Sequence, residues 1–336
     1  MGINLCDIPI DGARVGDIQA DKIYWGSTEV YSREEWYLTF VANSDGGYLS
    51  LLRYGNCSPS LQYSRDKVSW TQWDPSYSNI SLEGGKPLYL RGYNPDGLSF
   101  SESEYVTFNI VGAGGVHCYG SVMSLINGDS SIKTVPSRYC FYRLFYNNTQ
   151  ILSAPRFTAT ELSLWCYRQA FKYCSSLTTP MELPATSVPI GGYYETFHSC
   201  TALQKAPNLP ATALSEYAYS GLFRDCKSLT EAPDLPATTL AGFCYNYLFA
   251  GCNKIKRAPD LPSETLPQYC YNYMFKDCSS LNYVKCLAIN TSTTNCTSNW
   301  LSGVSSSGTF IKNPNKTNWP RGNSGIPSNW SVIDNS

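Results

Sequence analysis

Two carboxylates occupy equivalent places in a repeating part of the chain. Asp234 and Asp260 lie 26 residues apart, and Glu182 and Asn208 fall in the same row at the same interval. If successive repeats stack about 5 Å apart, the two aspartates are spaced for a retaining glycosidase pair or for calcium. A polar, solvent-exposed strand face explains the row more simply. We therefore predict a non-enzymatic binding surface here.

The histidines and glycines form no catalytic pattern. The chain has two His. His198 falls in a variable repeat position that holds basic residues elsewhere, which predicts a solvated face. His117 and Cys118 are adjacent, whereas a Cys–His dyad needs side chains that meet in space, so structural packing is expected. The run 112–115 lacks the features of a dinucleotide or P-loop motif and indicates a linker turn. We assign no catalytic, cofactor or metal-binding residue.

A 26-residue period organises these positions. Three rows recur at this interval without insertion: Phe145, Phe171, Phe197, Phe223, Phe249 and Phe275; Cys174, Cys200, Cys226, Cys252 and Cys278; and Ile151, Leu177, Leu203, Leu229, Ile255 and Leu281. Equivalent residues touch when repeats stack, so apolar rows predict a continuous core. The sequence thus predicts a solenoid of about seven rungs over residues 119–305.

Each rung is expected to contain a short strand and a short helix. Residues 229–236 place Leu229, Ala232 and Leu235 on one side, as in a strand that Pro236 ends. Residues 243–249 indicate one or two helical turns. The chain has 14 Cys, most of them in rows, and we expect buried free thiols that serve as small core residues. Stacked disulfides are the open alternative.

The outer positions of the repeat supply candidate binding residues. The row from Tyr167 to Tyr271 is expected to pack inside, whereas Tyr247 and Tyr273 fall in a neighbouring column whose residue varies between rungs. Variable positions on a regular scaffold are where binding diversity is usually placed. A further row alternates in charge, which suggests exposed ion pairs between rungs. The candidate surface comprises Glu182, Asn208, Asp234, Asp260, Glu231, Arg257, Tyr247 and Tyr273.

Composition bounds the remaining possibilities. The 336 residues carry a net charge of −1 and are 15% charged and 14% aromatic. These values exclude general disorder and the basic surface of a nucleic-acid binder, and no apolar run is long enough to cross a membrane. Residues 36–118 alternate apolar and polar side chains between turn clusters, which predicts an antiparallel β-sandwich. Residues 1–35 are expected to be a hairpin attachment segment, and residues 306–336 a C-terminal cap.

The repeat motif resembles a known family. Its elements are Cys226, Leu229, Leu235-Pro236, Cys244-Tyr245 and Phe249 in their spacing, and they resemble the BspA-type leucine-rich repeats of gut Bacteroidetes and their phages. The stretch 325–330 resembles the tail of the same family, and residues 21–31 resemble a hairpin at the start of phage structural proteins. The resemblance implies a leucine-rich-repeat solenoid with an adhesive or surface role.

The expected function is attachment. We expect a phage structural protein without cofactor, located in the virion, whose solenoid binds a glycan or protein of the host outer membrane. The N-terminal region would join other virion or tail proteins. The first residues show no secretory signal, which favours assembly in the host cytoplasm. A bacterial cell-surface adhesin and a virion decoration protein without receptor are the alternatives. Homo-oligomer formation is left open, and neither nucleic acid nor membrane insertion is expected.

Overall fold

The computed structural model describes residues 36–128 and 131–336, together with the backbone of five short strands between residues 2 and 32. These strands are β1 (Gly2–Asn4), β2 (Arg14–Val15), β3 (Ile18–Gln19), β4 (Lys22–Trp25) and β5 (Thr28–Ser32). Strands β4 and β5 pair antiparallel, as do β2 and β3. The rest of the predicted attachment segment, residues 1–35, lies outside the described residues.

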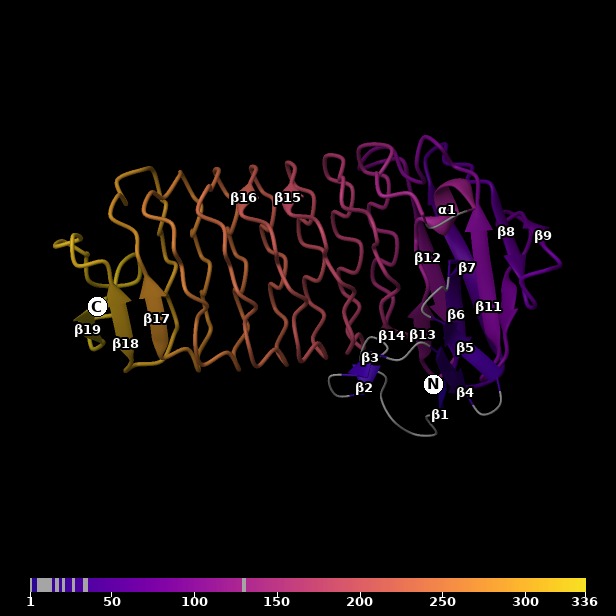
Figure 1. Ribbon diagram of the computed structural model, residues 1–336, viewed down its shortest axis with the longest axis horizontal. Coiled ribbons are helices and arrows are strands. Elements are labelled where there is room, and N and C mark those ends of the chain that lie inside the picture. The colour runs from indigo at the N-terminus through magenta and orange to yellow at the C-terminus, as the bar shows by residue number, and fades with distance from the viewer. Residues whose placement is uncertain are drawn as a thin grey trace.

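Two β-sheets form the N-terminal part of the described chain (Figure 1). The order β14-β13-β6-β11-β8-β9 makes one sheet, and β10-β7-β12 makes the other. Phe40 and Phe108, one from each sheet, bring their buried rings to 5.7 Å. The sequence prediction of a β-sheet region here is confirmed. The strands are β6 (Leu38–Ala42), β7 (Gly47–Tyr54), β8 (Leu61–Ser64), β9 (Thr71–Trp73), β10 (Ile80–Leu82), β11 (Pro87–Gly92), β12 (Tyr105–Val111), β13 (Val116–Tyr119) and β14 (Ile151–Ser153).

The N-terminal sheets are hydrogen-bonded directly to the first turn of the repeat region that follows them. The backbone N–H of Phe108 in β12 donates to the carbonyl of Leu144 at 2.8 Å. Strand β13 pairs in parallel with β14, with Val116 opposite Ile151. A helix of only four residues, α1 (Ser124–Asn127), connects the two parts. One cluster of buried apolar residues extends from Leu38 to Trp330, so both parts share a core.

The rest of the chain is a β-solenoid. About six of its turns lie within residues 187–334, and equivalent residues pair in parallel, for example Val188 with Leu214. The same parallel pairing joins Ser153 to Thr179 nearer the N-terminus. The predicted solenoid and its 26-residue period are therefore confirmed. Regular strands are short and include β15 (Ser187–Val188), β16 (Ala213–Leu214), β17 (Tyr283–Cys286), β18 (Thr309–Lys312) and β19 (Ser331–Asp334).

The predicted helix in each rung is wrong. Residues 243–252 and their equivalents every 26 residues form what we call the turn ladder. Alternate N–H groups, such as that of Tyr245, donate to the next rung, here to the carbonyl of Cys270 at 3.1 Å. The intervening groups close turns, as from Leu248 to the carbonyl of Tyr245. An α-helix keeps all its interior bonds within one segment and all its φ angles negative. The turn ladder instead has φ of 59° at Phe243 and 55° at Tyr247.

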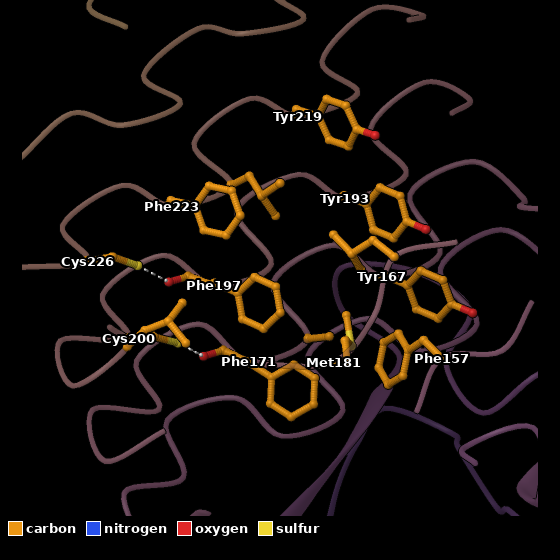
Figure 2. Packing of buried hydrophobic residues seen from close by; sticks show 14 of the residues in the cluster. Phe157, Tyr167, Phe171, Met181, Tyr193, Phe197, Cys200, Tyr219, Phe223 and Cys226 are labelled. Atoms are coloured by element: carbon orange, nitrogen blue, oxygen red, sulfur yellow. Dashed lines mark hydrogen bonds between the residues drawn. The ribbon is translucent and has the colours of Figure 1, made fainter. Parts of the chain in front are cut away.

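Stacked rows fill the solenoid core (Figure 2). The phenylalanine row from Phe145 to Phe275 has successive ring centroids 4.9–5.9 Å apart. The tyrosine row from Tyr167 to Tyr271 has spacings of 5.7–6.2 Å and is buried, as predicted. Each ring thus contacts its equivalents in adjacent rungs, which fixes the register of the stack.

The cysteine row has a polar role in addition to packing. The thiols of Cys174, Cys200, Cys226, Cys252 and Cys278 donate to the carbonyl of a phenylalanine in the preceding rung at 3.0–3.2 Å, as drawn for Cys200 and Cys226 in Figure 2. All cysteines among the described residues are free and buried. The prediction of free thiols is confirmed for them.

Candidate binding surfaces

The predicted polar row lies on the outside of the solenoid, on the segment that follows the turn ladder. Glu182, Asn208, Asp234 and Asp260 are all exposed. The carboxylate of Asp260 lies 2.9 Å from the Lys285 ammonium and 3.5 Å from the Arg257 guanidinium. These are exposed ion pairs, which contribute at most about 1 kcal/mol each. The row therefore presents a polar surface whose chemistry changes from rung to rung.

The alternating-charge row beside it is also exposed. The backbones of Lys205 and Glu231 form a parallel β-bridge between rungs. Arg257 forms the same kind of bridge with Tyr283, one rung further, and its guanidinium lies 3.7 Å from the ring centre of that residue. A cation over an aromatic face contributes about 0.5–1 kcal/mol at an exposed site. This contact holds Arg257 against the solenoid while its charge remains at the surface.

Tyr247 and Tyr273 project from the turn ladder. Their rings stack with centroids 4.6 Å apart, and both residues are partly buried. Arg224 lies 4.7 Å from the ring centre of Tyr247, and the Asn299 amide donates to the hydroxyl of Tyr273 at 3.4 Å. Because the two rings cover each other's facing sides, a partner meets mainly ring edges and hydroxyl groups here.

Sequence reasoning missed a second aromatic column on the same side. Phe243 lies with its ring centroid 4.6 Å from that of Tyr217 and 4.6 Å from that of Tyr269. Trp165 continues the column, with its ring centroid 5.9 Å from that of Tyr217. The equivalent residue of the rung between them is Gly191, and the Trp165 ring occupies the space that a side chain there would fill. The 26-residue spacing of these aromatic residues was the available signal. The faces of these stacked rings cover one another, so the main role of the column is to stabilise contacts between rungs.

A buried polar network crosses the turn ladder at His198. This side chain is 8% exposed, so the expectation of a solvated face is wrong. Its Nδ1 lies 3.3 Å from Glu195 Oε1 and its Nε2 lies 3.3 Å from Asp225 Oδ2. Glu195 also accepts hydrogen bonds from Lys172 at 2.6 Å and from Gln169 at 2.8 Å.

The network changes the acidity of its carboxyl groups. Burial alone would raise the pKa of Glu195, but the nearby His198 ring and the hydrogen bonds from Lys172 and Gln169 outweigh it and lower the pKa to about 2. His198 in turn lowers the pKa of Asp225, against the effect of burial. Both carboxylates are therefore charged at neutral pH and act as fixed links between rungs.

The other histidine has a structural role, as predicted. His117 and Cys118 are successive residues of β13, where side chains alternate between faces, and Cys118 is buried while His117 is half-buried. His117 Nδ1 lies 3.3 Å from the hydroxyl of Ser153. Burial lowers the pKa of His117 and raises that of the Cys118 thiol. The thiol thus stays protonated and packs in the core.

Within the described parts of the chain, no group of three His, Cys, Asp or Glu side chains is placed to hold a metal ion. No helix among the described residues is long and apolar enough to cross a membrane. Comparison of the chain with protein-family models, with curated proteins and with solved structures finds no match.

Proposed function

We propose that this protein is a non-enzymatic attachment protein of a phage particle, in which a leucine-rich-repeat solenoid of the BspA type binds the surface of the host cell. The observation that carries the proposal is the contrast between the two sides of each rung. Inward rows keep one chemistry, as in the phenylalanine and cysteine rows, whereas the exposed row of Glu182, Asn208, Asp234 and Asp260 changes. A constant core with a varied surface suits recognition.

The extended shape also supports the proposal. The N-terminal sheets and the last solenoid turns lie at opposite ends of the molecule (Figure 1). A protein attached through its N-terminal region would hold the solenoid surface away from the particle. The partner at that surface would be a glycan or protein of the bacterial outer membrane, and the partners at the N-terminal region would be other virion proteins.

Two fractions of an infected culture test the proposal. Mass spectrometry on purified particles and on washed outer membranes should find the protein in the particles, and the purified full chain should then reduce adsorption of particles to cells. Protein found only in membranes would favour a bacterial adhesin. Protein in particles without competition for adsorption would favour a decoration protein.

A further inference from the structure

A pocket on the outer face of the six-stranded sheet contains Arg91, which has no carboxylate partner among the residues that the structure describes. The pocket has a volume of about 310 Å³ and is lined by Ser60, Gln62, Arg91, Tyr93 and Asn127 with adjacent glycines. Arg91 in β11 and Gln62 in β8 are direct cross-strand neighbours. They lie on the outer face because Leu90 and Leu61, the adjacent residues, are fully buried.

The Arg91 guanidinium is positioned by two contacts. Its Nε donates to Gln62 Oε1 at 2.8 Å, and its central carbon lies 4.0 Å from the ring centre of Trp70. No ion pair joins Arg91 to a carboxylate of the described residues. The Nε–H group already donates to Gln62. The N–H groups of the two terminal nitrogens of the guanidinium are therefore left to donate to a ligand, and together they fit a carboxylate in bidentate geometry.

The rest of the pocket adds donors and an aromatic face. Gln62 uses its oxygen for Arg91, which leaves its NH₂ group as a donor. Tyr93 is 68% exposed, while its backbone N–H is held by the carbonyl of Ser60 at 3.2 Å. The ring thus offers an open face beside a fixed cation.

We infer that this pocket binds an acidic sugar, with the carboxylate on Arg91 and the sugar ring against Tyr93. The set of donors favours an acceptor that carries negative charge, and the exposed ring favours a flat, partly apolar face such as that of a pyranose. This site is separate from the solenoid surface and does not depend on its role.

Calorimetric titration of the full chain tests the inference. The probes are trigalacturonate, its methyl ester, and an acetylated tripeptide with a free terminal carboxylate. Trigalacturonate should bind, and the ester should bind about tenfold more weakly or worse, because it lacks the charge-assisted contacts. Equal binding of the ester, equal binding of the tripeptide, or no binding of trigalacturonate would overturn the inference.

Variants locate the site. Arg91→Gln should weaken binding of trigalacturonate by about tenfold or more, and Arg91→Lys should recover only part of it because an ammonium lacks the planar fork. Tyr93→Ala alters an exposed side chain and should also weaken binding without affecting folding. Arg53→Gln, at an exposed position near the end of β7 in the other sheet, is the matched control. Unchanged affinity in both Arg91→Gln and Tyr93→Ala would overturn the assignment.

Discussion

Single side chains connect the rungs of this solenoid in two different ways. Buried rings and thiols repeat their own contact from rung to rung, as in the row that includes Phe197 and Phe223 at 5.9 Å. The polar network at His198 occurs once and joins Glu195 to Asp225 in the next rung. Repeated contacts set the general stability of the stack, whereas the single network makes a local, charge-dependent contribution.

The first prediction concerns Glu195. Its folded-state pKa of about 2 lies below the ordinary value of 4.5, so the stability that it supplies is full above about pH 4.5 and is lost as the pH falls towards 2. Glu195→Gln should therefore lower the free energy of unfolding by roughly 3 kcal/mol at pH 7, measured by urea denaturation, and by progressively less at acid pH. The exposed Glu216→Gln is the control. If the difference in free energy of unfolding between Glu195→Gln and the natural protein did not change with pH, this account would be contradicted.

The turn ladder is the element that distinguishes this fold from a helical repeat. Its left-handed positions recur every four residues and hold Gly, Asn or Asp in several rungs, but large aromatic residues in others, such as Phe243. Left-handed backbone with positive φ is energetically unfavourable for a residue that has a Cβ atom. Stacking against the equivalent residues of neighbouring rungs, 4.6 Å away for Phe243, offsets that cost.

Gly191 tests this element. Its φ of +62° is matched by Gly221, but a methyl group at Gly191 would overlap the ring of Trp165, with its nearest atom at 1.9 Å, whereas one at Gly221 would lie 2.9 Å from the Cγ of Glu195. Gly191→Ala should destabilise the protein by about 1–3 kcal/mol more than Gly221→Ala, because overpacking adds to the backbone cost that both share. Thermal and urea unfolding of both variants measure the difference. Equal losses would mean that the ring can move aside.

The sequence predicted the stacking but not the local backbone. The 26-residue rows gave the solenoid, because equivalent residues must touch whatever the rung looks like. Inward residues such as Tyr245, Leu248 and Phe249 fit a helical period as well as the four-residue period of the turn ladder, so hydrophobic spacing alone could not separate them. Gly221, Asn299 and their equivalents favour left-handed backbone and were the available clue.

The candidate residues divide in the same way. Exposure of Asp234 and its row followed from the repeat, because the intervening positions had to face the core. The burial of His198 did not follow, since it depends on Glu195 and Asp225 being present in these particular rungs. Pairing of Asp260 with Lys285 likewise depends on one rung. The 26-residue period predicts the burial and exposure that all rungs share. Contacts that depend on the residues of a single rung cannot be predicted from it.

At the scale of the whole molecule, one core runs through the sheets and the solenoid. The N-terminal sheets supply β12 and β13 to the first rung. Near the other end, Trp300, Phe310 and Trp319 pack together within the last solenoid turns, with ring centroids 5.2–6.1 Å apart.

This continuity predicts the behaviour of a fragment. Residues 1–118 alone would expose Phe108, which packs on Phe145 at 5.5 Å, and would leave β13 without β14. The fragment should therefore lack a cooperative unfolding transition in urea, as followed by tryptophan fluorescence, whereas residues 1–207 should retain one. Cooperative unfolding of the 1–118 fragment at the same urea midpoint as the full chain would contradict this prediction. It would show that the sheets fold independently of the solenoid.

The central proposal is that the exposed row of the solenoid binds the cell of a bacterial host. The most direct measurement is the binding of fluorescently labelled full chain to intact cells of gut Bacteroidetes. It compares the natural protein with a variant in which Glu182, Asn208, Asp234 and Asp260 are alanine, and with a Glu216→Ala control. We predict saturable binding that the fourfold variant weakens by about tenfold or more and that the control leaves unchanged, since a few residues usually carry most of the binding energy. Unaltered binding by the fourfold variant, or no binding by the natural protein, would contradict the account.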